Sequence, residues 1–170
     1  MVMLWHEVDF DLIYKTIGKN GKFTLCYGPE KKPLRFQIPA AVSQYGVGSF
    51  SSINLDFSTH QTFINWFADL ETAIGAPEPF NSNMKNEFLR LKVDDSTLFF
   101  DWSNEMQQPG EIRGGMFSNS EIKCIVDISS IYFFNDVYGL TCRIYQMKTR
   151  ELGAPERKSD VPQHFAFTFT

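Results

Sequence analysis

Short runs of alternating apolar and polar residues, separated by turn residues, constrain the fold of this chain more than any other feature. Because successive side chains of a strand point to opposite faces, each run predicts a strand with one buried face. The connections carry turn signals such as Asn20-Gly21. The predicted strands span residues 8–12, 22–27, 34–38, 50–57, 88–93, 97–102, 121–128, 130–134 and 140–148. We expect residues 88–93 and 97–102 to form a hairpin around Asp94-Asp95-Ser96.

One segment has helical spacing instead. Its apolar residues recur at intervals of three and four: Phe63, Trp66, Phe67, Leu70 and Ile74. That spacing predicts a helix with one apolar stripe packed on the core. Ser58 or Thr59 is the expected N-terminal cap, and Gly75 followed by Pro77 is the expected stop.

Many strands and one helix predict a mainly β fold. The aromatic share of 15% supports this prediction, because aromatic residues favour sheet surfaces. Hairpins joined by turns favour an antiparallel barrel or sandwich over a parallel sheet. The specific prediction is an antiparallel Greek-key barrel like the oligonucleotide-binding (OB) fold, with one long α-helix and extra hairpins. Such a barrel often carries its helix between its third and fourth strands.

The length of 170 residues suits a single domain over residues 1–170. Residues 103–119 are polar and Gly-rich, and predict a mobile surface loop. Residues 149–162 predict a linker to a C-terminal strand. Residues 163–170 contain three Phe in strict alternation, so this strand needs a sheet partner within the fold or in a second copy, as in a homo-oligomer.

Composition bears on the compartment and the partners. No apolar run approaches the ~18 residues of a membrane span, and the N-terminus has no signal-peptide pattern. The three cysteines form no CxxC pair, which favours a reducing compartment. We therefore expect an intracellular, non-secreted protein without a membrane partner. The net charge is −4, but residues 36–84 contain no Lys or Arg, so the cations are concentrated elsewhere.

No catalytic, metal or cofactor site is predicted. His6, His60 and His164 lie far apart, without partners at metal-ligand spacing. Gly46-Val47-Gly48 lacks the strand-to-helix context of a phosphate loop, and is interpreted as a hinge. The chain is therefore expected to be non-catalytic, although an enzyme whose site the sequence does not reveal remains a weaker alternative.

The outward faces of three predicted strands combine cations with aromatic rings. Period two sends Phe88, Arg90 and Lys92 outward from one strand, and Arg143 and Tyr145 outward from another. Arg35 points outward in the same way. Single-stranded nucleic acid is bound by such faces, because cations contact phosphates and rings stack on unpaired bases. The alternative is that these residues are only the solvated face of a half-buried sheet.

Two parts of the chain resemble a known family. Residues 114–134 and 139–148 combine a small polar start, an alternating strand, an aromatic pair, a Gly turn and a strand with Arg and aromatic residues. Residues 34–39, Gly46-Val47, residues 53–57 and the predicted helix add a second match. This pattern resembles OB-fold single-stranded DNA-binding proteins of podophages and nucleocytoplasmic large DNA viruses. Many of these end in an acidic tail, whereas this chain ends in apolar, uncharged residues.

The resemblance implies a non-catalytic, sequence-independent single-stranded DNA-binding protein, acting in viral replication, recombination or repair in the host cytoplasm or nucleus. The expected contact residues are Arg35, Phe88, Arg90, Lys92, Arg143, Tyr145 and Lys148. Lys31, Lys32 and Arg150 would extend the electrostatic reach of this face. A structural or virion-assembly protein is the alternative. Binding is favoured if the outward residues of 88–93 and 140–148 share one face, and assembly if they do not.

Overall fold

The computed structural model describes residues 2–153, so the predicted C-terminal strand 163–170 and most of the linker before it lie outside the described residues. The strands are β1 Ile13–Ile17, β2 Phe23–Tyr27, β3 Leu34–Gln37, β4 Ala41–Ser43, β5 Ser52–Asp56, β6 Met84–Lys85, β7 Phe88–Lys92, β8 Leu98–Asp101, β9 Met106–Gln107, β10 Ser120–Phe134 and β11 Val137–Glu151. One α-helix, α1 Gln61–Ile74, lies between β5 and β7 in sequence, and the 3₁₀ turns are Trp5–Glu7, Phe10–Leu12 and Ser49–Ser51. The fold is mainly β, as predicted.

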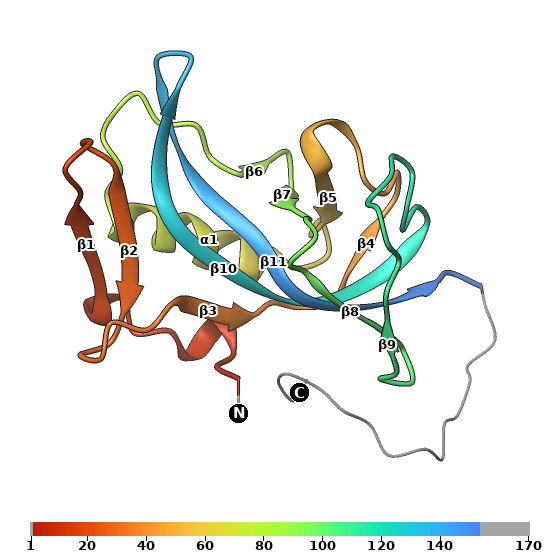
Figure 1. The fold of residues 1–170 in the computed structure, drawn as a ribbon. Helices are drawn as coiled ribbons and strands as arrows, with labels where there is room; N and C mark the ends of the chain where they lie inside the picture. Colours follow the sequence, from red (N-terminus) through yellow and green to blue (C-terminus); the bar gives the residue numbers. More distant parts are fainter. Residues whose placement is uncertain (1, 154–170) are drawn as a thin grey trace.

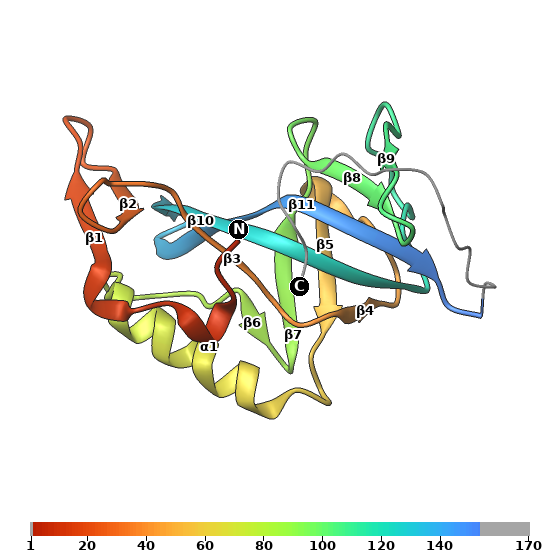
Figure 2. The ribbon, with the colours of Figure 1, turned by 90° about the horizontal axis from the view of Figure 1, so that it is seen from below.

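The sheet closes into a five-stranded barrel, in which β3 and β4 together count as one strand (Figures 1 and 2). β4 pairs with β5, β5 with β7, and β10 with β11, all antiparallel. β7 meets β11 in parallel at Lys92 and Arg143, which joins the two halves of the sheet. β10 returns to β3 and β4 and completes the circle. A closed barrel is therefore confirmed, although the β7–β11 contact is parallel and not antiparallel as predicted.

The two longest strands, β10 and β11, form one hairpin that supplies two walls of the barrel. The predicted strands 121–128 and 130–134 are one continuous strand. Its register shifts at Ile125/Val126 and at Ile128/Ser130, and such bulges bend a strand enough to curve around a barrel. The connecting turn is shorter than predicted, since only Asn135 and Asp136 separate the strands, both with positive φ.

Residues 88–101 depart from the prediction of a hairpin. β7 and β8 do not pair with each other, because both run parallel to β11. The connection between them bends without reversing the chain. The Asp94 carboxylate accepts the Ser96 N–H at 2.9 Å, and Thr97 Oγ1 donates to the Ile144 carbonyl at 2.8 Å. The turn-forming residues thus attach this connection to β11.

The first strand is also placed differently from the prediction. Residues 5–12 form two 3₁₀ turns, and the Asp9 carboxylate accepts the Asp11 N–H at 3.0 Å. This local hydrogen bond competes with strand pairing, so alternation over 8–12 was misleading. The strand begins at Ile13 and pairs with β2 across the predicted Asn20-Gly21 turn. The β1–β2 hairpin extends the sheet beside β10.

The core lies inside the barrel and between the barrel and α1. The strand residues predicted to face inward are buried: Leu34, Phe36, Ile38, Ile53, Leu55, Phe57, Leu89, Leu91, Val93, Leu140, Cys142 and Ile144. From the helix, Phe63, Phe67, Leu70 and Ile74 are buried, whereas Trp66 is only partly buried. The helix ends at Gly75, as predicted, and this glycine adopts the left-handed conformation.

The prediction of the helix cap was wrong. The N-cap position is His60, which makes no side-chain cap bond. Ser58 and Thr59 belong to the preceding turn, where Asp56 accepts the Ser58 N–H at 2.8 Å and the His60 N–H donates to the Phe57 carbonyl. The carboxylate therefore orders the turn before the helix rather than the helix end.

Residues 103–119, which were predicted to form a mobile surface loop, contain one short strand. β9 lies within them and pairs with β8, and the Phe117 ring stacks on Phe99 with centroids 5.4 Å apart. β11 continues through residues 149–151, so the predicted linker begins inside a strand. Among residues 2–153 no helix is long and apolar enough to cross a membrane.

Candidate nucleic-acid interface

A row of cross-strand neighbours brings three predicted contact residues together on the outside of the barrel. Lys92 on β7 lies opposite Arg143 on β11, Arg143 lies opposite Asp127 on β10, and Asp127 lies opposite Arg35 on β3. Ser52 on β5 lies on the other side of Lys92. Directly paired residues point to the same face of a sheet, so the outward residues of 88–92 and 140–148 share one face.

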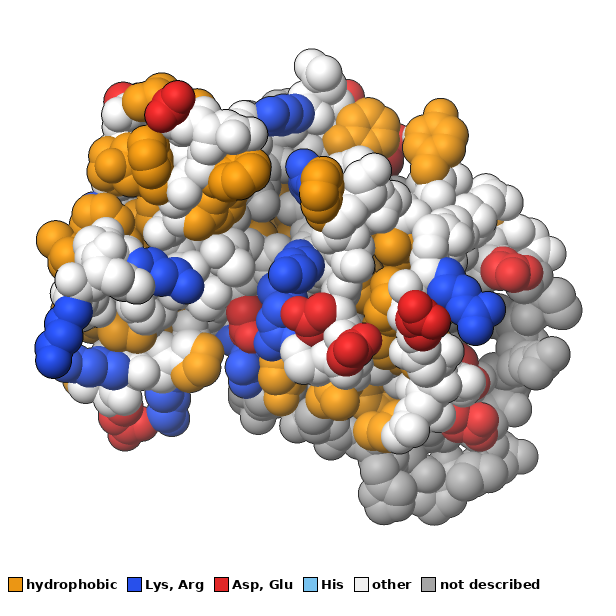
Figure 3. Space-filling view, turned by 45° about the horizontal axis from the view of Figure 1, so that its top comes forward, with side chains coloured by type: hydrophobic (Ala, Val, Ile, Leu, Met, Phe, Trp, Pro, Cys, Tyr) orange, Lys and Arg blue, Asp and Glu red, His pale blue; other side chains and the backbone are white. Residues whose placement is uncertain are grey.

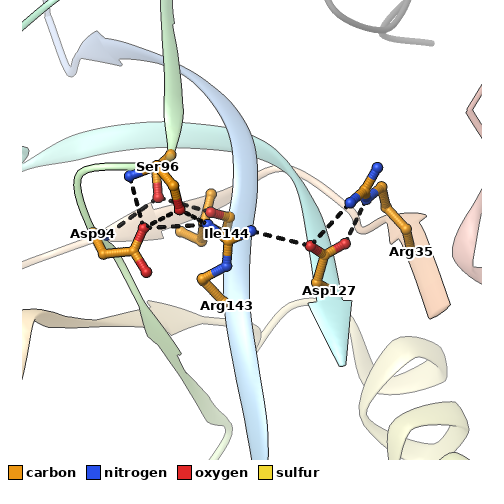
Figure 4. A network of polar contacts seen from close by, with 7 residues as sticks. Arg35, Asp94, Ser96, Asp127, Arg143 and Ile144 are labelled. Atoms are coloured by element: carbon orange, nitrogen blue, oxygen red, sulfur yellow. Dashed lines mark hydrogen bonds and ion pairs between the residues drawn. The ribbon is translucent and has the colours of Figure 1, made fainter. Parts of the chain in front are cut away.

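The two arginines of this row are held by carboxylates (Figure 4). Arg35 donates to Asp127 through Nε at 2.6 Å and Nη2 at 3.3 Å. Arg143 donates through Nη2 to the same carboxylate at 3.3 Å, and through Nη1 to Asp94 at 3.2 Å and to Ser96 Oγ. Two positive and two negative side chains form this network, so it is neutral as a whole.

Tyr145 also lies within this network. The Arg35 guanidinium carbon lies 3.6 Å from the centroid of its ring, a cation–π contact. Tyr145 is half-buried. A base that stacked on this face of the ring would have to displace Arg35.

The cations of β7 are more open than those of β11. Arg90 and Lys92 are both exposed. Arg90 donates from Nε to Ser52 Oγ at 3.1 Å, and lies opposite the exposed Asn54 on β5. Within residues 2–153 no carboxylate pairs with either cation. Phe88, at the start of the same strand, is half-buried opposite Asp56.

Two further predicted cations, Lys148 and Arg150, lie around Trp102, after β8. Lys148 Nζ lies 5.2 Å and the Arg150 guanidinium 4.2 Å from the ring. Lys148 donates to Asn104 at 2.8 Å, and Arg150 pairs with Glu121 at 3.1 Å. Burial lowers the pKa of Lys148, and the nearby charges of Lys123 and Arg150 add to this effect.

Lys31 and Lys32 lie elsewhere, in the connection between β2 and β3, where Lys32 pairs with Glu30 at 3.0 Å. Lys32 lies opposite Tyr27, and neither lysine belongs to the cross-strand pairs that align Lys92, Arg143, Asp127 and Arg35. The structure therefore does not add these two lysines to the row that contains Lys92 and Arg143.

Sequence reasoning missed two exposed aromatic residues in the loop between β4 and β5. Tyr45 is 83% exposed and Phe50 is 87% exposed. Phe50 has a φ of 60°, a left-handed conformation that is rare for a bulky residue. Strained residues of this kind cluster at functional sites. A Tyr and a Phe among Gly and Ser residues were the signal available in the sequence.

The base of this loop is fixed although its tip is exposed. The Val47 N–H donates to the Met116 carbonyl and the Gly115 N–H donates to the Val47 carbonyl, both at 2.8 Å. Gly46 has a φ of 70°, and a Cβ there would collide with the Met116 carbonyl. These contacts, rather than a hinge, account for the glycine, and they hold the Tyr45 and Phe50 side chains out from a firm base.

A second group of exposed aromatic residues lies at the tip of the β10–β11 hairpin. Phe133 is 59% and Phe134 67% exposed, and Tyr132 is less exposed beside them. The hairpin tip and the loop before β5 lie at the upper side of the molecule, with β6 and β7 between them (Figure 1). The face turned toward that side carries separate groups of hydrophobic side chains with Lys and Arg between them (Figure 3).

No protein-family model matches the chain, and a search of curated proteins finds no match either. The site is therefore defined by its own geometry: a closed five-stranded barrel with open cations on β7, and with exposed rings in the β4–β5 loop and at the tip of the β10–β11 hairpin. Among residues 2–153 no three His, Cys, Asp or Glu side chains are grouped so that they could hold a metal ion.

Proposed function

We propose that this protein binds single-stranded DNA without sequence specificity and without catalysis, on an OB-type barrel. Counted along the chain, the barrel strands are β3 with β4, then β5, β7, β10 and β11. Around the barrel, β4 is followed by β5, β7, β11 and β10, and β10 pairs again with β3 and β4. In chain positions this order is first, second, third, fifth, fourth and back to first. This crossing order supports a Greek-key OB barrel. The helix lies one connection earlier than expected, between the second and third strands.

The observation that carries the proposal is the position of the exposed aromatic residues relative to this order. OB barrels bind oligonucleotides on the face of strands two and three and on the loops between strands one and two and between strands four and five. In this chain the first of these loops carries Tyr45 and Phe50, and the end of β10 beside the second carries Phe133 and Phe134. The strands between them carry the open cations of β7.

The proposed chemistry follows from these groups. Phe50 and Phe134 would stack on unpaired bases, at about 1–3 kcal/mol for each base. Arg90 and Lys92 would contact phosphates, and stacking with phosphate contact does not discriminate between base sequences. Arg35, Arg143 and Tyr145 are already engaged with one another or with carboxylates, so we assign them a secondary place in the contact set. Such a protein would serve replication, recombination or repair.

Fluorescence anisotropy with labelled single-stranded and duplex oligonucleotides tests the proposal. We expect tighter binding to the single strand, little difference between base sequences, and affinity that falls steeply with salt as counterions are released. Equal affinity for duplex, or no binding at low salt, would overturn it.

A structural or assembly role is the second candidate, because the same exposed side chains could meet protein instead. Phe134 and Ile17 are the most exposed apolar residues of the β10–β11 and β1–β2 hairpins, at 67% and 69%. Analytical ultracentrifugation in the absence of DNA separates the two candidates. Concentration-dependent assembly that is lost in Phe134→Ser, without any DNA binding, would favour the assembly role.

A further inference from the structure

We propose that Asp94 occupies the phosphate site of Arg143 in the free protein and is displaced when single-stranded DNA binds. The inference rests on the proposed function. It concerns how that function is regulated, since a carboxylate already in place lowers the affinity of the neighbouring cation for any other anion.

The two carboxylates that hold Arg143 differ in how firmly they are fixed. Asp127 has a side chain only 10% exposed, and Arg35 holds it with two further hydrogen bonds. Asp94 has a side chain 32% exposed, and it meets Arg143 through a single oxygen at 3.2 Å. Asp94 is therefore the partner that a phosphate can replace.

The connection that carries Asp94 keeps its own support when Arg143 is removed from it. Asp94 accepts the Ser96 N–H at 2.9 Å and the Ser96 hydroxyl at 2.6 Å. Thr97 donates to the Ile144 carbonyl at 2.8 Å, and so ties the connection to β11 next to Arg143. Because Asp94 Oδ1 accepts the bond from Arg143 as well as both bonds from Ser96, the exchange requires the Arg143 guanidinium to turn from Asp94 to a phosphate, while Asp94 keeps its bonds to Ser96.

The Asp94 carboxyl is ionised, so it competes with a phosphate for Arg143. Burial alone would raise the pKa of this carboxyl, but the hydrogen bonds from Ser96 and the charge of Arg143 outweigh burial and hold the pKa below its ordinary value. The displacement also changes the local charge. With Asp94 in place, two carboxylates compensate Arg35 and Arg143; after displacement, Asp127 alone faces both arginines, and the local charge beside Lys92 is more positive.

Neutralising Asp94 while keeping its hydrogen-bond acceptor tests the inference. Asp94→Asn should bind single-stranded DNA about two- to fivefold more tightly, which corresponds to the free energy of a partly exposed ion pair. The dependence of log affinity on log salt should change little, because Arg143 contacts a phosphate in the complex of both proteins.

Asp95→Asn is the matched control. Asp95 is the exposed neighbour with no hydrogen bond or ion pair among residues 2–153, and its substitution changes the net charge equally. We expect it to leave both affinity and salt slope nearly unchanged. Arg143→Gln combined with Asp94→Asn should abolish the gain, because the gain requires the freed guanidinium.

The outcomes separate the two proposals. If wild type binds single-stranded DNA, but Asp94→Asn and Asp95→Asn behave alike, the inference is wrong and the proposed function stands. If neither wild type nor variants bind, the proposed function fails and this inference fails with it. Should Asp94→Asn melt early, Asp94→Ser, which keeps a turn-forming hydroxyl, gives the same comparison.

Discussion

Replacing Phe50 by Ala is the sharpest test of the loop aromatics, because the ring contributes little to the fold. Phe50 is 87% exposed, so only about an eighth of its surface is buried. For a ring that buries roughly 200 Å² when fully enclosed, this is about 25 Å², or about 0.6 kcal/mol. The strained φ is retained in the variant, since Ala meets the same backbone penalty. We expect a melting temperature within a few degrees of wild type.

The affinity for single-stranded DNA should respond much more strongly. A base stacked on Phe50 contributes about 1–3 kcal/mol, so Phe50→Ala should weaken binding about 5- to 150-fold. The salt slope should stay unchanged, because stacking releases no counterions. Anisotropy titrations at several salt concentrations, paired with thermal melts, measure both quantities.

Ile17→Ala is the control for this experiment. Ile17 is 69% exposed on β1, outside both aromatic loops, and an aliphatic side chain offers no stacking face. Its removal should leave affinity within about twofold of wild type. The reasoning is refuted if Phe50→Ala also binds within twofold of wild type, or if it weakens binding no more than Ile17→Ala does.

Three further predictions concern stability and reactivity. Burial raises the pKa of the Glu71 carboxyl above its ordinary value of 4.5. The contribution of this group to stability is therefore full below pH 4.5 and is lost as pH rises through the raised pKa. Glu71→Gln should raise the melting temperature at pH 7–8, and this gain should vanish toward pH 4. Asp127→Asn should cost roughly 1–3 kcal/mol in urea unfolding, less than the ~3–5 kcal/mol of a fully buried pair because the arginines stay partly exposed; an unchanged midpoint would contradict this. Burial raises the pKa of the Cys124 and Cys142 thiols, so a native-state thiol titration should label Cys26 alone, and labelling of all three before unfolding would contradict the buried positions.

The inside and outside of most strands could be predicted from sequence, because that assignment depends only on local alternation. Leu89 and Leu91 alternate with Arg90 and Lys92, and the burial follows the same order in the structure. Alternation was misleading over residues 8–12, where an aspartate side chain offered the backbone a local hydrogen bond. Local pattern thus predicts a strand face well only where no side chain competes for the backbone.

Strand partners could not be predicted in the same way, and the β7–β8 connection shows why. Asp94-Asp95-Ser96 has turn chemistry, which predicts that the chain bends, but not whether it bends back. Whether β7 and β8 pair depends on β11, some fifty residues later, which pairs with both. The hairpin prediction failed because the competing partner is distant in sequence.

The same distinction applies to the candidate site, where the direction of a side chain could be predicted but its cross-strand neighbour could not. Period two predicted that Arg35 and Arg143 point outward, but not that a carboxylate would lie between them. Arg35 and Asp127 are 92 positions apart, and only the register of β3 on β10 and of β10 on β11 places both arginines on that carboxylate. Two cations that looked equivalent to Lys92 in sequence are therefore compensated, while Lys92 is not. For a protein that meets phosphates, the affinity of each cation is set by its cross-strand neighbour, so the register determines the electrostatics of the site as well as the fold.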